Sequence, residues 1–360
     1  MEVLLKAVRK KFGVVPALDG VDAEFPHQTF TCIYGPPGAG KSTLLRIVAG
    51  LEVPDSGEVF IGRKDMTFAP PKERNVSYIA QEFALYPHMS VFQNIAYPLR
   101  LRKYPEATIR EKVLQVARFL KIDKLLDRKP AQLSGGEQQR VAIARGLVKE
   151  SSIYVFDEPL TNLDYKIRED MRGEFRRFQR EFGQTIIYAT GDPVEALSLS
   201  ERIIILNGGK VVESGDTRQV YRQPANLFTM MHFGFPQANV VPGEIIPGGI
   251  FSCPLFSVKC ALVGIPRDEK AVCTFRPEDI ALVGEDFRGV VFVGRVFVVD
   301  VIGSESVIYV RVGENGEIVR ILAERNCRPG LDENVKMGIQ PEKMLFYSSL
   351  DGSFLGKGGS

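Results

Sequence analysis

Residues 35–43 form the run Gly35-Pro36-Pro37-Gly38-Ala39-Gly40-Lys41-Ser42-Thr43, a glycine-rich loop of the kind that binds phosphate groups. An apolar strand is expected before it, over residues 29–34, and a helix after it, over residues 44–49. Glycines let the backbone approach phosphates closely, and the N–H groups at a helix start attract anions. We expect the whole run to line a nucleotide, with Lys41 at the β- and γ-phosphates and Ser42 on Mg²⁺.

Length and composition are those of an ordinary soluble protein with two or three domains. The chain has 360 residues, of which 44% are hydrophobic and 25% charged, and its net charge is +2. Such a small net charge does not indicate a nucleic acid or an acidic membrane surface as a partner. We expect neither a signal peptide nor a transmembrane helix, since the most apolar stretch, residues 289–303, contains Arg295 and Asp300. The five cysteines form no Cys-x-x-Cys pair, which favours reduced thiols in the cytoplasm.

The pattern along the chain predicts two domains and a tail. Over residues 1–235, short apolar strands alternate with helical patterns, as in a mostly parallel α/β fold. Residues 236–350 are rich in Val, Ile, Gly and Pro and predict a small β-barrel domain. The proline-containing segment 221–239 predicts a linker between the two. Small polar residues at the end predict a flexible tail over residues 351–360.

A second apolar strand ends in two carboxylates, in the run Ile153-Tyr154-Val155-Phe156-Asp157-Glu158. Adjacent strand residues point to opposite faces, so both acids reach one site only if the chain turns directly after Asp157. Pro159 favours such a turn. Asp157 is then expected to hold Mg²⁺, and Glu158 to orient or deprotonate a water molecule. The alternative is a pair of surface acids that caps the strand.

A third segment, Leu133-Ser134-Gly135-Gly136-Glu137-Gln138-Gln139-Arg140-Val141-Ala142-Ile143-Ala144-Arg145, resembles the signature motif of the ABC (ATP-binding cassette) ATPases. Ser134, Gly135 and Gly136 would expose a helix N-terminus, which is an anion site. In that family the site clamps the γ-phosphate of ATP held on the P-loop of a second subunit. The resemblance therefore implies an α/β P-loop ATPase domain with a helical subdomain, ATP and Mg²⁺ as cofactors, and a homodimer or heterodimer of such ATPases.

Three further positions match the family pattern. Phe12 matches the aromatic residue that stacks on adenine, although a core phenylalanine would give the same sequence. Gln81 matches the glutamine that contacts Mg²⁺ and the attacking water and responds to the transmembrane partner. Asp164, in the run Leu160-Thr161-Asn162-Leu163-Asp164, matches a nucleotide-site loop that crosses to the opposite subunit, and a local helix cap is its alternative.

The C-terminal region resembles the regulatory domain of carbohydrate-importer ATPase subunits, an all-β barrel of the oligosaccharide/oligonucleotide-binding type. The similar segments are residues 275–280, 298–305 and 340–347. This resemblance implies two transmembrane permease subunits and an extracytoplasmic solute-binding protein as partners, and a place on the cytoplasmic face of the cell membrane. The linker and barrel most resemble those of sugar, sugar-phosphate, glycerol or polyol importers, which implies a solute of that kind, although related importers of polyamines or anions share the layout. A nucleic-acid-binding barrel is the alternative, but no basic stripe with interleaved aromatics supports it.

One position departs from the family pattern. The expected strand 185–190 is followed by Gly191, where the family has a histidine that contacts the γ-phosphate and aligns the water with Glu158. Loss of one such donor typically slows catalysis by about 100- to 1000-fold. None of the three histidines, His27, His88 and His232, is close in sequence. Two hypotheses remain open: a working importer ATPase, or a hydrolytically weak subunit that acts as a scaffold or regulator beside a second ATPase.

Overall fold

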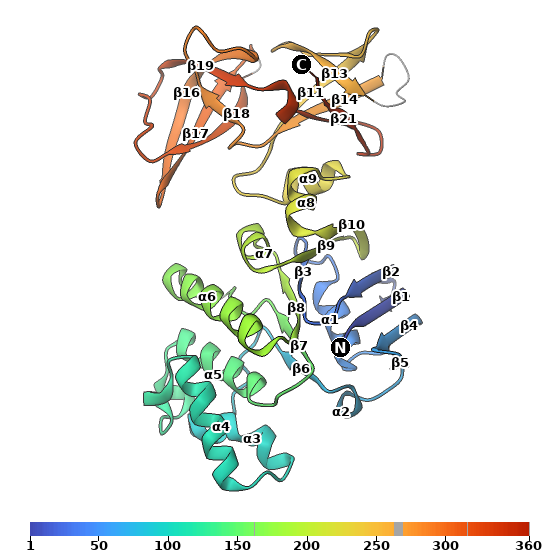
Figure 1. Ribbon diagram of the computed structural model, residues 1–360, viewed down its shortest axis with the longest axis vertical. Coiled ribbons are helices and arrows are strands. Elements are labelled where there is room, and N and C mark those ends of the chain that lie inside the picture. The colour runs from blue at the N-terminus through green and yellow to red at the C-terminus, as the bar shows by residue number, and fades with distance from the viewer. Residues whose placement is uncertain (162, 263–268, 315, 360) are drawn as a thin grey trace. The chain divides into compact units, whose positions relative to one another are not determined.

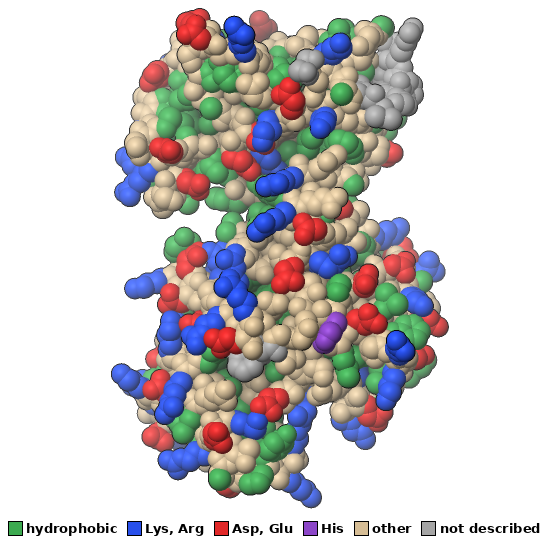
Figure 2. Space-filling view, viewed as in Figure 1, with side chains coloured by type: hydrophobic (Ala, Val, Ile, Leu, Met, Phe, Trp, Pro, Cys, Tyr) green, Lys and Arg blue, Asp and Glu red, His purple; other side chains and the backbone are tan. Residues whose placement is uncertain are grey.

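The computed structural model describes residues 1–161, 163–262, 269–314 and 316–359. The chain divides into two compact units, Met1–Thr217 and Arg218–Ser360 (Figure 1). The boundary therefore lies earlier than residue 235, where the sequence predicted it. No helix within the described ranges is long and apolar enough to cross a membrane. On the face drawn in Figure 2, charged side chains of both signs are interspersed, in keeping with the small net charge.

The first unit alternates strands and helices, as the sequence predicted. Its strands are β1 (Val3–Phe12), β2 (Val15–Phe25), β3 (Phe30–Tyr34), β4 (Ser56–Ile61), β5 (Lys64–Asp65), β6 (Val76–Ile79), β7 (Ile153–Asp157), β8 (Thr185–Thr190), β9 (Arg202–Asn207) and β10 (Lys210–Asp216). Its helices are α1 (Lys41–Ala49), α2 (Pro71–Arg74), α3 (Val91–Leu101), α4 (Glu106–Phe119), α5 (Gly135–Leu147), α6 (Tyr165–Phe182) and α7 (Pro193–Leu199), with 3₁₀ turns at Asp123–Leu125 and Pro130–Gln132.

Two sheets organise this unit. A four-stranded antiparallel sheet has the order β2-β1-β4-β5, and a six-stranded sheet has the order β10-β9-β3-β8-β7-β6. Every pairing in the larger sheet is parallel except that of β9 with β10. The carboxyl ends of β3, β8, β7 and β6 therefore meet along one edge, which is where open α/β sheets bind ligands.

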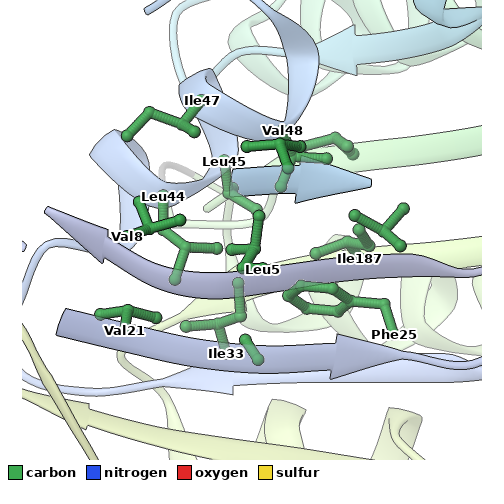
Figure 3. Close-up of a cluster of buried hydrophobic side chains, with 14 of the residues drawn as sticks. Leu5, Val8, Val21, Phe25, Ile33, Leu44, Leu45, Ile47, Val48 and Ile187 are labelled. Atoms are coloured by element: carbon green, nitrogen blue, oxygen red, sulfur yellow. The ribbon is translucent and has the colours of Figure 1, made fainter. Parts of the chain in front are cut away.

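The core of the first unit explains why the strand before the glycine-rich loop and the helix after it are apolar. All five residues of β3 are buried, because the strand lies inside the larger sheet. Figure 3 shows the apolar side chains of α1, among them Leu44, Leu45 and Val48, packed with Leu5 and Ile33 from the strands. Burying an aliphatic side chain of this size contributes about 1.5–3 kcal/mol, so this packing fixes the loop between β3 and α1.

The second unit consists of α8 (Thr217–Arg222, which begins at the boundary), α9 (Leu227–His232) and two antiparallel β-structures. A closed barrel joins β11 (Asn239–Ile246), β12 (Ile250–Ser252), β13 (Ser257–Leu262), β21 (Phe354–Gly358), β20 (Leu345–Ser348) and β14 (Glu269–Phe275) in that order. A five-stranded sheet has the order β15 (Ile280–Leu282), β19 (Asn334–Ile339), β16 (Val290–Ile302), β17 (Glu305–Val312), β18 (Glu317–Glu324), and a 3₁₀ turn covers Pro341–Lys343. The two share one hydrophobic core.

The segment predicted as a linker is bound to the second unit instead. The buried guanidinium of Arg276 donates to the carbonyl oxygens of Phe233 at 2.7 Å and Tyr221 at 3.0 Å. The hydroxyl of Tyr347 donates to the carbonyl of Pro224 at 2.8 Å. Such buried donors require acceptors, and the backbone of α8, α9 and their connection supplies them.

The predicted flexible tail over residues 351–360 also differs from the structure. Residues 354–358 form β21, which pairs with both β13 and β20 and closes the barrel. Gly358 serves close packing rather than flexibility, since a Cβ there would lie 2.0 Å from the carbonyl oxygen of Pro341. Ser360 lies outside the described residues.

Candidate active site

Helix α1 begins without a side-chain cap. Its N-cap residue, Gly40, has φ = 101° and makes no side-chain cap hydrogen bond. A Cβ at Gly40 would lie 2.4 Å from the carbonyl oxygen of Ala17, so no larger residue fits. Four N–H groups at a helix start lack intrahelical partners. An anion therefore fits against this turn, at the amino end of the helix dipole.

Lys41 is the first residue of α1, and its ammonium group lies inside the loop. Its Nζ donates to the carbonyl oxygens of Gly35 at 2.7 Å and Pro36 at 3.1 Å. It also forms an ion pair with Oε1 of Glu158 at 3.1 Å. The side chain of Lys41 is 4% exposed. An ammonium has three donors, and these three partners match that number.

Asp157 ends β7 and binds two hydroxyl groups from different elements. The Ser42 hydroxyl donates to its Oδ1 at 2.9 Å, and the Tyr78 hydroxyl donates to its Oδ2 at 2.7 Å. Burial and the nearby Asp157 carboxylate raise the pKa of Tyr78, so that this phenol stays a donor. The sequence predicted Ser42 and Asp157 separately as Mg²⁺ ligands, and the structure brings their side chains together. The sequence gave no indication of Tyr78.

The chain turns at Glu158, so that both acids face the same site. Glu158 has φ = 46°, a left-handed conformation that is rare outside glycine. Its N–H donates to the carbonyl oxygen of Ala189 on β8 at 3.0 Å. The turn brings Asp157 to Ser42 and Glu158 to Lys41, whereas a continuing strand would separate the two carboxylates.

Gly191 and Gln81 lie at the same edge of the sheet. Gly191 directly follows β8, the neighbour of β3, and a Cβ there would lie 3.6 Å from the carbonyl oxygen of Gly35. Gln81 is exposed two residues beyond the end of β6. In the described part of the chain, no hydrogen bond joins Gln81 to Lys41, Asp157 or Glu158.

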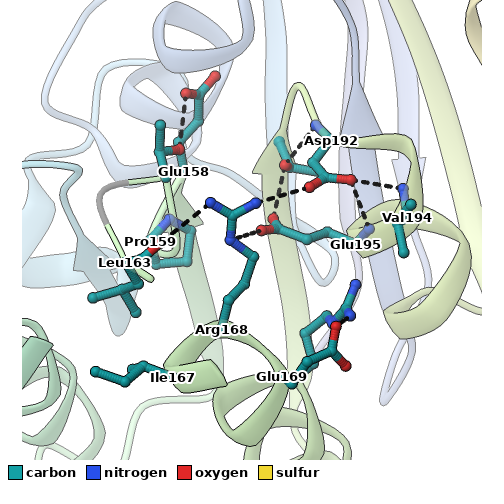
Figure 4. A network of polar contacts seen from close by, with 12 residues as sticks. Glu158, Pro159, Leu163, Ile167, Arg168, Glu169, Asp192, Val194 and Glu195 are labelled. Carbon is teal, nitrogen blue, oxygen red and sulfur yellow. Dashed lines mark hydrogen bonds and ion pairs between the residues drawn. The ribbon is translucent and has the colours of Figure 1, made fainter. Parts of the chain in front are cut away.

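A polar network, not foreseen from the sequence, holds the loop after Gly191 (Figure 4). Arg168 donates to Oδ2 of Asp192 and to the carbonyl oxygen of Leu163, at 3.2 and 3.3 Å, and lies 3.8 Å from Oε1 of Glu195. Asp192 also caps α7. Burial raises the pKa of Glu195. Arg168 thus ties the start of α6 to the loop that follows β8.

The remaining predicted residues are at the surface. Phe12 is 51% exposed, so it is not a core residue, and the Lys10 ammonium lies 5.5 Å from its ring centroid. Ser134 caps α5 in a reciprocal pair with Glu137, and both Ser134 and Gly135 are exposed while Gly136 is half-buried. Asp164 caps α6 by accepting from the N–H of Ile167, which is the local role considered above. Residue 162 of its loop lies outside the described residues.

Comparison with known proteins places these features in one family. Residues 18–161 match the family model "ABC transporter", and residues 274–346 match "TOBE domain". The chain is 40% identical, over 338 residues, to the sn-glycerol-3-phosphate import ATP-binding protein UgpC of Rhizobium meliloti (strain 1021), covering 93% of this chain and 94% of that protein. The chain belongs to the ABC transporter ATPase family.

Two other matches agree with this assignment. The trehalose/maltose import ATP-binding protein MalK of Thermococcus litoralis is 36% identical over 356 residues, with 92% of this ABC ATPase and 94% of MalK covered. Among solved structures, a dimer of the ATP-binding cassette MJ0796 bound to ADP and phosphate has a TM-score of 0.56 and 34% identity. The match covers 60% of this chain and 99% of the MJ0796 chain.

The matches confirm the predicted family, the ABC ATPase fold of the first unit and the all-β C-terminal domain. They also establish the chain as an ATPase of this family, in which ATP is the nucleotide. They give no support to the alternative of a hydrolytically weak subunit.

The effect of having glycine at position 191 on the rate of ATP hydrolysis can be measured directly. The backbone there is not left-handed, and a side chain meets only ordinary contact distances, so Gly191→His is expected to fold. An imidazole at this edge supplies one more donor to a phosphate, and turnover is expected to rise about tenfold. Phosphate release, measured beside Gly191→Ala, tests this. A folded histidine variant with the turnover of the alanine control would contradict the prediction.

Proposed function

We propose that this chain is the ATP-hydrolysing subunit of an importer. The imported solute is small and polar, and belongs to the sugars, glycerol, glycerol phosphates or polyols. The observation that carries the proposal is the match over 93% of the chain, through both units, to a subunit that serves glycerol-3-phosphate import. The similarity to a trehalose/maltose import subunit supports the same solute class. Two such ATPase chains, identical or different, would act with two permease subunits and an extracytoplasmic solute-binding protein, at the cytoplasmic face of the membrane.

The site residues suit Mg²⁺ bound together with ATP. The described residues contain no group of three or more His, Cys, Asp or Glu side chains that could hold a metal ion. A metal at this site would take most of its ligands from phosphates and water, as Mg²⁺ commonly does. Ser42 and Asp157 would hold it, with Gln81 as a further partner at the same edge. Bound there, Mg²⁺ would neutralise charge on the β- and γ-phosphates.

Lys41 and Glu158 are expected to change partners when the nucleotide binds. Because all three Lys41 donors already have partners, a phosphate at Lys41 must displace at least one of them. Displacement of Glu158 would free its carboxylate to accept a proton from water. We expect Phe12 to stack on adenine, and Ser134, Gly135, Gly136 and Asp164 to act at the ATP held by the opposite subunit.

A cavity beside the predicted catalytic edge suits contact with a permease. It measures about 240 Å³ and lies between the loop after β6 and helices α3 and α5. Arg145 donates to the carbonyl oxygens of Phe83 and Ala84 and stacks on Tyr86, so this loop is well fixed. A permease segment seated here would contact the loop that carries Gln81, which links transport to the ATP site.

Reconstitution tests the proposed function. The chain would be combined with the permease and solute-binding protein encoded beside it, in vesicles loaded with ATP. Uptake of labelled glycerol 3-phosphate, glycerol, a disaccharide and a polyol would then be compared with that of an amino acid. We expect ATP-dependent uptake of one of the first four and none of the amino acid. Uptake of the amino acid alone would overturn the solute class, and uptake without ATP would overturn the coupling.

A further inference from the structure

Tyr78 reaches Asp157 because of the register of two neighbouring strands. In the parallel pairing of β6 with β7, Tyr78 lies opposite Val155, and paired residues face the same side of a sheet. Asp157 is two residues further along β7, or roughly 7 Å at about 3.3 Å per residue. The long phenol side chain bridges this offset, and its hydroxyl lies 2.7 Å from Oδ2 of Asp157.

Asp157 is thus held through one oxygen while the other faces the expected metal. Its Oδ1 binds the Ser42 hydroxyl, its Oδ2 binds the Tyr78 hydroxyl, and the residue is 4% exposed. The half-buried Tyr78 packs against the hydrophobic core of the first unit, which restricts its movement. Rotation of the carboxylate would break its bond to Tyr78, and a hydrogen bond to an ionised group is among the stronger ones in proteins.

We propose that Tyr78 is a positioning residue for the metal site, holding Oδ2 of Asp157 so that Oδ1 stays beside Ser42. This inference rests on the proposed binding of Mg²⁺ at Ser42 and Asp157. Tyr78 contacts neither nucleotide nor water in this role, because it acts through Asp157 alone. The phenol hydroxyl is the part that matters, and phenylalanine keeps the packing of the ring while removing the donor.

The test uses the full chain and Mn²⁺ as a probe for the metal. The Kd of Mn²⁺ would be measured by electron paramagnetic resonance in the presence of a non-hydrolysable ATP analogue. Tyr78→Phe is expected to raise this Kd about tenfold, the size of a lost hydrogen bond to a charged group. Affinity for the analogue in excess chelator is expected to stay unchanged. The matched control is Tyr154→Phe, which removes a buried hydroxyl that donates to the carbonyl oxygen of Leu147.

Asp157→Asn separates this inference from the proposed metal site. If Asp157→Asn leaves the Mn²⁺ Kd unchanged, the metal site itself is refuted. If Asp157→Asn weakens Mn²⁺ binding while Tyr78→Phe matches the Tyr154→Phe control, only the role of Tyr78 is overturned. An equal loss of analogue affinity with and without metal in Tyr78→Phe would show a general structural effect and would also overturn it.

Discussion

Replacing Lys41 by alanine is expected to abolish measurable ATP binding. Lys41 is the cation enclosed by the glycine-rich loop, held by the carbonyl oxygens of Gly35 and Pro36 and by Glu158. A hydrogen bond between charged groups contributes about 1.5–3 kcal/mol, and Lys41 would offer more than one to the phosphates. The Kd for ATP should therefore rise by at least about a hundredfold, as titration calorimetry would measure.

The control for this variant is another ion-paired lysine of the same unit. Lys112 pairs with Glu150, away from the loop, so Lys112→Ala is expected to keep the affinity for ATP. Circular dichroism on both variants would verify that the fold is retained. If a folded Lys41→Ala variant binds ATP with an unchanged Kd, the glycine-rich loop is not the nucleotide site.

Replacing Glu158 by glutamine is expected to stop hydrolysis while leaving ATP binding intact. Glutamine keeps the size of the side chain but cannot accept a proton from water, and general-base catalysis contributes about 10²- to 10⁴-fold in rate. The ion pair with Lys41 is also lost, so the phosphates no longer compete with a carboxylate for this ammonium. Turnover should fall at least about a hundredfold, with ATP affinity equal to or higher than that of the parent.

Glu150→Gln is a close control for this second variant. Glu150 is also left-handed, with φ = 50°, and also pairs with a lysine, but it lies away from the catalytic edge. Its variant should hydrolyse ATP normally. Because unhydrolysed ATP is expected to hold two subunits together, light scattering should detect an ATP-dependent dimer of Glu158→Gln. Normal turnover in Glu158→Gln would show that another residue acts as the general base.

The central part of the first unit was largely predictable, because β3, β7 and β8 are buried along their whole length. Such strands appear as short apolar runs, and the expected strand over residues 185–190 coincides with β8. The strand before the loop and the helix after it were found within a few residues of β3 and α1. The glycine-rich loop, Glu158 and Gly191 directly follow the carboxyl ends of β3, β7 and β8. Predicting the order of these strands was therefore enough to bring the three segments to one edge.

Some contacts in the site depend on the register of neighbouring strands and on side-chain rotamers, and neither can be inferred from the amino-acid composition of a segment. Tyr78 sits in a short strand where any apolar residue would suit the packing, and only the alignment of β6 with β7 brings its hydroxyl to Asp157. Arg168 lies within a strongly charged helix, where nothing distinguishes it from its exposed neighbours until Asp192 and Glu195 are seen beside it.

The second unit was predicted as all-β, but its limits were not. Proline and small polar residues indicated a linker and a tail, because these residue types are common in mobile segments. The same residue types also suit close backbone packing. Arg276 and Tyr347 take backbone carbonyls of the supposed linker as acceptors, and Gly358 lets β21 lie against Pro341. These contacts join residues far apart in sequence, which local composition does not describe.

Because β21 closes the barrel, the barrel cannot be completed until β21 has been synthesised. Its neighbours β13 and β20 are synthesised earlier, but the barrel wall between them stays open until residues 354–358 have been added. Two strand edges with unpaired N–H and C=O groups are exposed during that interval, and such edges recruit other chains. The barrel of the second unit is therefore completed only after β21 has been synthesised, and a chain that ends before Phe354 would leave the edges of β13 and β20 exposed.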